Sequence, residues 1–244
     1  MKYAIINGVK AEAIKGTSGT CPTCGSELVA KCGEVKVNHW AHKGNRNCDP
    51  WWENETNWHR SWKNNFPIDW QEVVHSAENG EKHIADVKTE NGWVIEFQHS
   101  YLKPDERHSR STFYNKLVWV VDGMRRERDK QQFQDLLKDC RVINDKPLIC
   151  RIFYPDECRI LNEWLACNAF VLFDFNVLDN FGNALWFLFP NKSESTANLM
   201  CFPRSDFIQY HITGIFDDLM IKTNQLMFNI QELSKINSQI MKQK

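Results

Sequence analysis

The feature that most constrains this fold is a pair of strand-like segments joined through an Asn-Gly turn. Residues 83–88 and 93–98 carry β-branched and aromatic residues, and Asn91 and Gly92 lie between them. Asn-Gly is the dipeptide that most strongly favours the tight turn of an antiparallel hairpin. The sequence therefore predicts a β-hairpin over residues 83–98.

Helical and strand patterns are interleaved on both sides of this hairpin. Aromatic and polar residues recur three and four positions apart over residues 51–65, which predicts a helix. After the hairpin we expect a helix from Pro104 to about residue 116, a buried strand over 117–121, a helix over 125–138, two or three strands within 141–190 and a helical tail from about residue 205. This order predicts an α/β fold with a mixed sheet.

Composition and patterning divide the chain into four regions. These are a small module over residues 1–50, a core over 51–140, additional strands and a helix over 141–204, and a C-terminal helix over 205–244. Hydrophobic residues make up 42% and charged residues 25% of the 244 residues, which is typical of a globular protein and excludes collagen or a coiled-coil rod. The formal net charge of -1 excludes a strongly basic protein that coats nucleic acid, although it permits a local basic groove.

The sequence also predicts a cytoplasmic protein with no membrane partner. The N-terminus lacks the apolar segment of a secretory signal, and no apolar run approaches the roughly 18 residues of a membrane span. The nine cysteines, an odd number, are typical of a chain whose thiols are mostly reduced.

Two short motifs in the N-terminal module predict a structural zinc site. Cys21 and Cys24 form a C-x2-C pair, and His39 and His42 form an H-x2-H pair after a segment that suits a β-hairpin. Zn²⁺ binds four nitrogen or sulfur atoms tetrahedrally, so these four side chains are the expected ligands.

Two alternatives to this ligand set remain open. Cys32 or Cys48 can substitute for one of the histidines. The C-x2-C pair can also be redox-active, although such a pair usually lies beside a βαβ unit, which this region lacks.

Acidic and amide side chains share one face of the hairpin. Glu96 and Gln98 are two residues apart, so they project to the same side of a strand, and the hairpin brings Asp86 beside Glu96. Carboxylate oxygens suit Mg²⁺ or Mn²⁺, which promotes phosphodiester hydrolysis. The pattern Asp-x9-Glu-x-Gln is a variant of the PD-(D/E)xK nuclease motif, with Gln98 where lysine is commonest. An ordinary solvated strand face is the alternative interpretation.

A stripe of polar residues on the predicted helix before the hairpin supports the nuclease interpretation. Glu55, His59 and Lys63 are spaced four apart, so Glu55 can reach the metal while His59 or Lys63 contacts phosphate. An ordinary charged helix face is the simpler alternative.

A second stripe follows the hairpin, where Glu106, Arg110 and Tyr114 are again four apart. We expect this stripe to contact the DNA backbone. The candidate catalytic residues are therefore Glu55, Asp86, Glu96 and Gln98, the expected Mg²⁺ ligands are Asp86, Glu96 and Glu55, and the supporting or phosphate-binding residues are His59, Lys63, Arg110 and Tyr114.

Taken in order along the chain, these motifs resemble the competence protein CoiA-like nuclease family. The resemblance covers about residues 15–125. It implies a zinc-binding head, a restriction-endonuclease-like core and a role in DNA processing, such as recombination of incoming DNA or defence against foreign DNA. One departure is Lys82-His83, where family members often carry arginine.

The main functional hypothesis is therefore a metal-dependent nuclease that acts on DNA, because all three carboxylates are present. The alternative is a zinc-containing DNA- or protein-binding module with a vestigial nuclease core, which acts as an interaction subunit with a protein partner. Gln98 in place of lysine and the near-neutral charge favour this alternative.

Apolar residues recur every seven positions in the tail. The first series is Ile212, Leu219, Leu226, Leu233 and Ile240, and the second is Phe216, Thr223, Ile230 and Asn237. Such a stripe predicts either self-association through this helix or packing of the helix against the sheet of its own chain.

Overall fold

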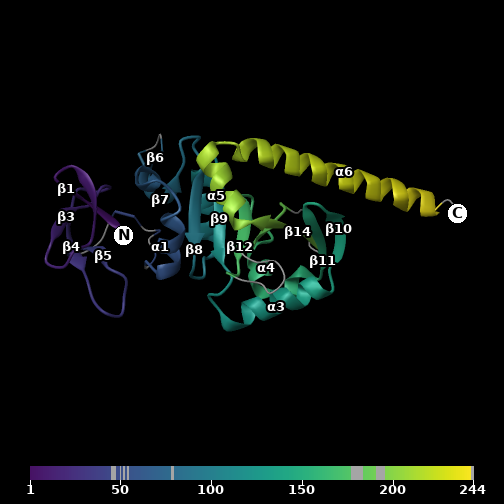
Figure 1. The fold of residues 1–244 in the computed structure, drawn as a ribbon, viewed down its shortest axis with the longest axis horizontal. Coiled ribbons are helices and arrows are strands. Elements are labelled where there is room, and N and C mark those ends of the chain that lie inside the picture. Colours follow the sequence, from purple (N-terminus) through teal and green to yellow (C-terminus); the bar gives the residue numbers. More distant parts are fainter. Residues whose placement is uncertain are drawn as a thin grey trace.

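The protein contains two β-sheets that lie next to each other along its long axis (Figure 1). The computed structural model describes residues 1–44, 48, 49, 51, 53, 55–77, 80–176, 184–190 and 196–242, with no side chains described at 231 and 233–242. The N-terminal sheet lies at one end of the molecule, and the C-terminus lies at the other.

The N-terminal sheet is a small antiparallel one with the strand order β2-β1-β3-β4-β5. Its strands are β1 (Tyr3–Ile6), β2 (Val9–Glu12), β3 (Ser18–Thr20), β4 (Glu27–Lys31) and β5 (His39–His42). The predicted hairpin between the C-x2-C and H-x2-H motifs is present, since β4 pairs with β5 with Val29 opposite Ala41. Few apolar side chains are buried beneath this sheet, so it has only a small core.

The larger sheet has the order β10-β11-β14-β13-β12-β9-β8-β7-β6. Its strands are β6 (Gln71–Ser76), β7 (Lys82–Lys88), β8 (Val94–Gln98), β9 (Leu117–Asp122), β10 (Arg141–Asp145), β11 (Leu148–Phe153), β12 (Phe170–Asp174), β13 (Ala184–Leu188) and β14 (Thr196–Pro203). Among these, β8, β9 and β12 are parallel and the other pairs are antiparallel. The Asn-Gly hairpin is present between β7 and β8, and Gly92 adopts a φ of +80° at its turn.

Helices cover both faces of the larger sheet, which makes a mixed α/β fold and confirms the predicted fold class. On β9, Trp119 and Val121 face one apolar cluster while Val118 and Val120 face another, because successive side chains of a strand alternate. The first cluster lies under α2 (Pro104–Phe113), α3 (Glu127–Lys138) and α4 (Arg159–Trp164), and the second lies under α1 (Asn57–Lys63), α5 (Arg204–Thr213) and α6 (Phe216–Lys242). Two 3₁₀ turns, η1 (Ile68–Trp70) and η2 (Pro155–Glu157), complete the elements.

The helix predicted over residues 51–65 is shorter than expected, because α1 begins only at Asn57. Thr56 is its N-cap, and its hydroxyl accepts a hydrogen bond from the backbone N–H of His59, whose ring in turn bonds the Thr56 backbone. This reciprocal capping box fixes the start of the helix. Glu55 therefore lies outside the helix rather than on it.

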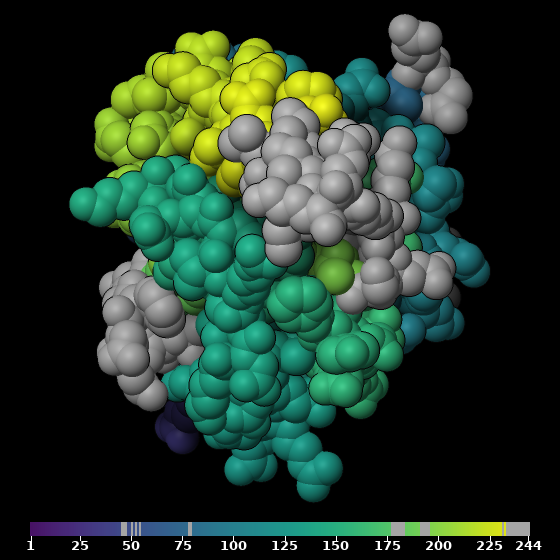
Figure 2. Space-filling view, turned by 90° about the vertical axis from the view of Figure 1, so that its right-hand side faces the viewer, coloured from purple at the N-terminus to yellow at the C-terminus, as the bar shows by residue number. Residues whose placement is uncertain are grey.

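The single helical tail predicted from residue 205 is broken into two helices. Gly214 takes the left-handed φ of +76° and ends α5, so Ile212 belongs to α5, is exposed and lies outside the stripe of α6. Phe216, Met220 and Met227 are buried against the larger sheet. The view onto the end of the molecule shows the yellow part of α6 at the top of the body (Figure 2).

The first half of α6 thus packs on its own sheet, as one of the two interpretations of the heptad pattern expected. The side chains of Leu233, Asn237 and Ile240 lie outside the described residues. Self-association through this helix stays a prediction. Within the described residues, no helix is long and apolar enough to cross a membrane.

Candidate functional site

Three cysteines and one histidine converge in the N-terminal module. The Sγ atoms of Cys21, Cys24 and Cys48 and a ring nitrogen of His42 all lie within 4.8 Å of one another. The two sulfurs of Cys21 and Cys48 are 3.9 Å apart, and Nε2 of His42 lies 3.4 Å from the sulfurs of Cys24 and Cys48. Neighbouring ligands of a tetrahedral zinc ion with Zn–S bonds of ~2.3 Å are separated by roughly 3.8 Å. The cluster therefore fits a structural metal such as zinc.

The fourth member of the cluster is Cys48, so the prediction of His39 as a ligand is wrong. His39 and His42 are three residues apart on β5, and a strand projects such residues to opposite faces. Nδ1 of His39 instead lies 2.9 Å from a backbone carbonyl oxygen. Cys32, the other substitute considered, bonds the carbonyl oxygen of Ala13 and is not in the cluster.

A tight turn directs the first two cysteines toward each other. The N–H of Gly25 donates to the carbonyl oxygen of Cys21 at 3.0 Å, and Gly25 adopts a φ of +72°, which glycine tolerates. Burial raises the pKa of the Cys24 thiol, but hydrogen bonding with Ser26 and His42 outweighs burial and lowers this pKa to about 6. The thiolate, which is the form that binds a metal, is therefore favoured near neutral pH.

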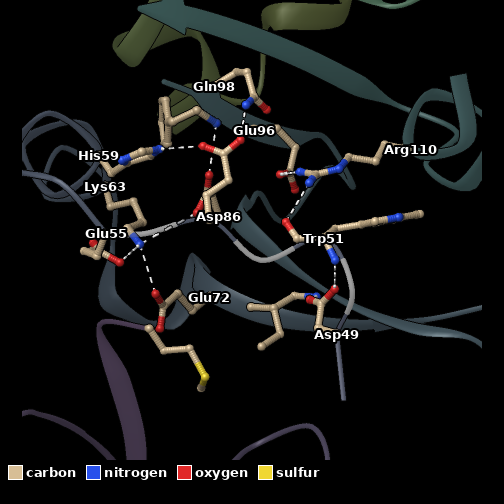
Figure 3. Close-up of a pocket in the computed structure, with 14 residues that line it drawn as sticks. Asp49, Trp51, Glu55, His59, Lys63, Glu72, Asp86, Glu96, Gln98 and Arg110 are labelled. Atoms are coloured by element: carbon tan, nitrogen blue, oxygen red, sulfur yellow. Dashed lines mark hydrogen bonds and ion pairs between the residues drawn. The ribbon is translucent and has the colours of Figure 1, made fainter. Parts of the chain in front are cut away.

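An acidic pocket lies between this module and the edge of the larger sheet (Figure 3). Its described lining includes six carboxyl groups and three nitrogen-bearing side chains that can be cationic. The acids are Asp49, Glu53, Glu55, Glu72, Asp86 and Glu96, and the others are His59, Lys63 and Arg110. The negative charge of the pocket therefore exceeds the charge that its own cations neutralise.

Three of the acids lie in a row across neighbouring strands. The register pairs Val87 with Ile95, which places Asp86 opposite Glu96, as the hairpin predicted. On the other side, the pairs on either side of Glu72 place it opposite Asp86. At this level β7 and β8 no longer form their regular ladder, and Oδ2 of Asp86 accepts a hydrogen bond of 3.0 Å from the N–H of Phe97. The parting of the strands thus opens the floor of the pocket.

Glu96 is the carboxyl group of this row whose pKa is raised. It is buried, and Gln98 is buried on the same face, while Ile95 and Phe97 pack into the opposite core as predicted. Burial and the charge of Asp86 raise the pKa of Glu96 well above its ordinary value, although Arg110 opposes the shift from 3.6 Å. No group in the described part of the chain donates a hydrogen bond to Oε1 of Glu96.

Lys63 neutralises part of the acidic row from α1. Its Nζ lies 2.9 Å from a carboxylate oxygen of both Glu55 and Glu72 and 3.7 Å from Oδ1 of Asp86. Burial alone would lower the pKa of Lys63, but the charges of Glu72 and Glu55 raise it. Two indole N–H groups of α1 donate to Asp174 at the end of β12, which anchors the helix that carries Lys63.

Gln98 and His59 meet at Glu53, which the sequence did not point to. The side-chain amide of Gln98 donates to Glu53 and, at 3.0 Å, to the carbonyl oxygen of Ser100. Nδ1 of His59 accepts a hydrogen bond from the backbone N–H of Thr56 in the capping box, and this contact orients the ring. The other nitrogen, Nε2, lies 3.8 Å from Glu53. Both predicted residues thus line the pocket and hold one acid at its rim.

The second predicted stripe is turned inward. Arg110 lines the pocket, where it approaches Glu96, binds Glu106 at 2.5 Å and donates to the backbone of Trp51 at 2.6 Å. Tyr114 is 3% exposed and does not line the pocket, and burial and the charge of Glu96 raise its pKa. Burial therefore leaves neither Arg110 nor Tyr114 free for the expected surface contact with the DNA backbone.

The sequence interpretation missed Asp49, Glu53 and Glu72. Asp49 follows Cys48 directly, and its carboxylate bonds the ring of His83 at 3.1 Å and the N–H of Ile84 at 3.0 Å. Glu72 accepts hydrogen bonds from the backbone N–H groups of residues 2 and 3 at 2.7 and 2.9 Å. Nothing in the local sequence pointed to Glu72, because only the pairing of β6 with β7 places it level with Asp86.

The donor set of this row fits a hard divalent cation. Asp86 and Glu96 offer carboxylate oxygens, and Oε1 of Glu96 is a buried acceptor that its described neighbours leave without a donor. A cation such as Mg²⁺ takes one or two carboxylates and keeps several water molecules. Glu55, the third predicted ligand, lies in the same pocket, but one of its oxygens is held by Lys63.

Comparison with known proteins agrees with the resemblance that the motifs predicted. Residues 6–50 match the family model described as competence protein CoiA, N-terminal domain. The chain is also 24% identical over 171 residues to competence protein CoiA of Bacillus subtilis (strain 168), a match that covers 64% of this chain and 46% of that protein. No solved structure matches the chain. The chain is thus similar to competence protein CoiA, and the match spans about half the length of this curated relative.

Proposed function

We propose that this CoiA-like protein is a metal-dependent nuclease that hydrolyses phosphodiester bonds of DNA during DNA processing. The observation that carries the proposal is Glu96, a buried carboxylate beside Asp86 with a raised pKa and an acceptor oxygen that lacks a donor among the described residues. Two ionised carboxylates close together in a buried site repel each other, so one keeps a proton unless a divalent cation takes the place of that proton. The relative's name supports the biological setting of competence.

Each group has a role in this proposal. Asp86 and Glu96 would hold Mg²⁺ or Mn²⁺, and such an ion would supply an activated water molecule and stabilise negative charge on the phosphoryl group. Lys63 lies among Glu55, Glu72 and Asp86 and offsets part of their negative charge. Gln98 orients the attacking water by a hydrogen bond, since an amide can donate or accept but not exchange a proton readily.

The decisive experiment is a cleavage assay on the purified full chain. Linear, supercoiled and single-stranded DNA and RNA are each incubated with Mg²⁺, Mn²⁺ or EDTA. We expect cleavage of DNA that requires the divalent ion and is lost in Asp86→Asn, while Glu90→Gln, which alters an exposed acid of the same hairpin, retains it. Cleavage that persists in EDTA, or at the wild-type rate in Asp86→Asn, contradicts the assignment.

A second candidate function is a zinc-containing DNA- or protein-binding module with a vestigial nuclease core. Gln98 in place of lysine, together with the inward orientation of Arg110, is the specific observation in its favour. DNA binding without cleavage under any of these conditions, or binding of a protein partner alone, would support it. We also propose that the protein is cytoplasmic. We propose further that it has a partner in a DNA-processing or defence complex and that it self-associates through α6.

A further inference from the structure

A histidine–aspartate pair lies where two parallel strands end beside the acidic pocket. His99 follows the last residue of β8, and Asp122 is the last residue of β9. Nδ1 of His99 lies 2.7 Å from Oδ2 of Asp122. This distance is at the short end of the range of roughly 2.7–2.9 Å for a charge-assisted hydrogen bond between nitrogen and a carboxylate oxygen. The carboxyl ends of parallel strands are where α/β sheets usually bind their ligands.

The two members of this pair differ in exposure. The Asp122 side chain is 5% exposed, and its other oxygen accepts the N–H of Met124 at 2.8 Å, so the carboxylate is fixed. The His99 side chain is 38% exposed. The arrangement therefore holds the imidazole from its buried side and leaves its outer edge accessible to a ligand.

The contact also fixes which ring nitrogen carries the proton. An ionised carboxylate can only accept, so the proton of the neutral ring lies on Nδ1, and Nε2 is left to take up and release a proton. This is the arrangement by which a buried aspartate orients a proton-transferring histidine in hydrolytic enzymes.

His99 lies beside residues that line the pocket. It follows Gln98 directly, and its ring centre is 5.9 Å from that of His59 and 6.3 Å from that of Trp58. The imidazole of His99 therefore lies next to the pocket, one residue from Gln98 and beside the ring of His59.

Apart from Asp86 and Glu96, which the proposal assigns to the ion, the described groups that line the pocket include no better proton donor for a leaving oxygen. Lys63 is held among three carboxylates, which raise its pKa, and the Arg110 guanidinium does not deprotonate in proteins. Gln98 has no proton to exchange, and Nε2 of His59 faces Glu53.

We propose that His99, oriented by Asp122, is the general acid of the phosphodiester cleavage. In this step the oxygen of a water molecule bonds to phosphorus and releases one proton to solvent, the bond from phosphorus to the leaving oxygen breaks, and the proton on Nε2 of the imidazolium moves to that oxygen. His99 is left neutral, and solvent restores its proton. This inference rests on the proposed nuclease function.

The test compares two leaving atoms. Oligonucleotides carry either the natural bridging oxygen or a bridging sulfur at the position that the wild-type products identify as the leaving one. Because a thiolate leaves without protonation, His99→Ala should lower cleavage of the oxygen substrate about 10²-fold or more but lower cleavage of the sulfur substrate less than about tenfold. Asp122→Asn should show the same selectivity, and His108→Ala, which removes an exposed histidine of α2, should leave both rates unchanged.

The outcomes separate this inference from the proposal on which it rests. Equal losses on both substrates in His99→Ala would overturn the general-acid role while leaving the nuclease function intact. A wild-type protein that cleaves neither substrate with Mg²⁺ or Mn²⁺ would overturn both.

A second measurement needs neither activity nor metal. In ¹⁵N-histidine-labelled full-length protein, with His99 assigned by its loss in His99→Ala, we expect the neutral ring to be protonated on Nδ1. Asp122→Asn should abolish this preference, because its amide can donate as well as accept. A ring protonated on Nε2 in the wild type would contradict the orientation.

Discussion

The cysteine–histidine cluster and the acidic pocket each offer a set of ligands that fits a cation, and the two sets are built in opposite ways. The cluster consists of three cysteine sulfurs and one histidine nitrogen, and two of the sulfurs come from a single turn. All four ligand atoms lie within 4.8 Å of one another. The pocket gathers six oxygen-bearing acids from separate parts of the chain and neutralises only some of them with Lys63 and Arg110. A closed set of ligands suits a structural ion, whereas a partly neutralised, open set suits an ion that must also meet a substrate.

The two arrangements are physically joined. Cys48 belongs to the cluster and Asp49, the next residue, lines the pocket and bonds β7. The start of β1 docks on Glu72 in the same pocket. The N-terminal module therefore forms one wall of the pocket, so we expect that loss of a metal ion from the cluster also disturbs the acids.

The largest effect is expected from removing a charge of the acidic row. Asp86→Asn preserves the size of the side chain and an acceptor for the N–H of Phe97, but removes a charged ligand. We expect cleavage to fall about 10³-fold, equivalent to ~4 kcal/mol of transition-state stabilisation. Initial rates measured beside Glu90→Gln, with circular dichroism as a check on folding, test this. A fall of less than tenfold would place the metal elsewhere.

The next effect distinguishes the cluster from the motif that the sequence suggested. Cys48→Ser should release the metal and locally unfold the N-terminal module, because small metal modules obtain much of their folding free energy from the ion. His39→Ala should retain the metal, since His39 faces away from the cluster. Metal content by mass spectrometry and limited proteolysis of both variants check this. The reverse result would restore His39 as the ligand.

A smaller effect is expected on the free energy of unfolding, with opposite signs for substitutions at Glu96 and at Glu72. Burial and Asp86 raise the pKa of Glu96, so the folded state holds this proton more tightly than the unfolded chain, and stability falls as pH rises above the ordinary value. In Glu72, burial is outweighed by Lys63 and the pKa is lowered to about 2, so its contribution is present above about pH 4.5 and is lost as pH falls toward 2.

These signs predict the outcome at neutral pH without added metal. Glu96→Gln should raise Tm, by roughly 2–4 °C for each kcal/mol gained, and Glu72→Gln should lower it. Added Mg²⁺ or Mn²⁺ should stabilise the wild type and not Glu96→Gln, because the ion needs the charged oxygen. Thermal melts of the wild type and the two variants test these expectations. A lower Tm for Glu96→Gln would show that the ion pair with Arg110 already stabilises the charged form of Glu96.

The smallest effect is expected at Gln98. Its amide makes neutral donor contacts to Ser100 and a contact to Glu53, and one such hydrogen bond is worth about 1 kcal/mol. Gln98→Ala should therefore lower cleavage about tenfold, far less than Asp86→Asn. A loss as large as that of Asp86→Asn would give Gln98 a part in binding the ion itself.

Local patterns in the sequence determined much of both sites. The Asn-Gly turn fixed the β7–β8 hairpin, and the alternation along β8 placed Glu96 and Gln98 on one face with Asp86 opposite Glu96. The C-x2-C spacing likewise identified Cys21 and Cys24. These features depend on residues close together in the chain, where backbone geometry alone sets which side chains meet.

Only the tertiary structure decided which distant residues complete each site. Cys48 replaced His39 because β5 projects residues three apart to opposite faces, and Glu72 joined the row because β6 pairs with β7 in one register. His99 met Asp122 because parallel pairing of β8 and β9 aligns their carboxyl ends. Such contacts join segments through the shared sheet, so their partners are set by strand register and crossover, which local spacing does not encode.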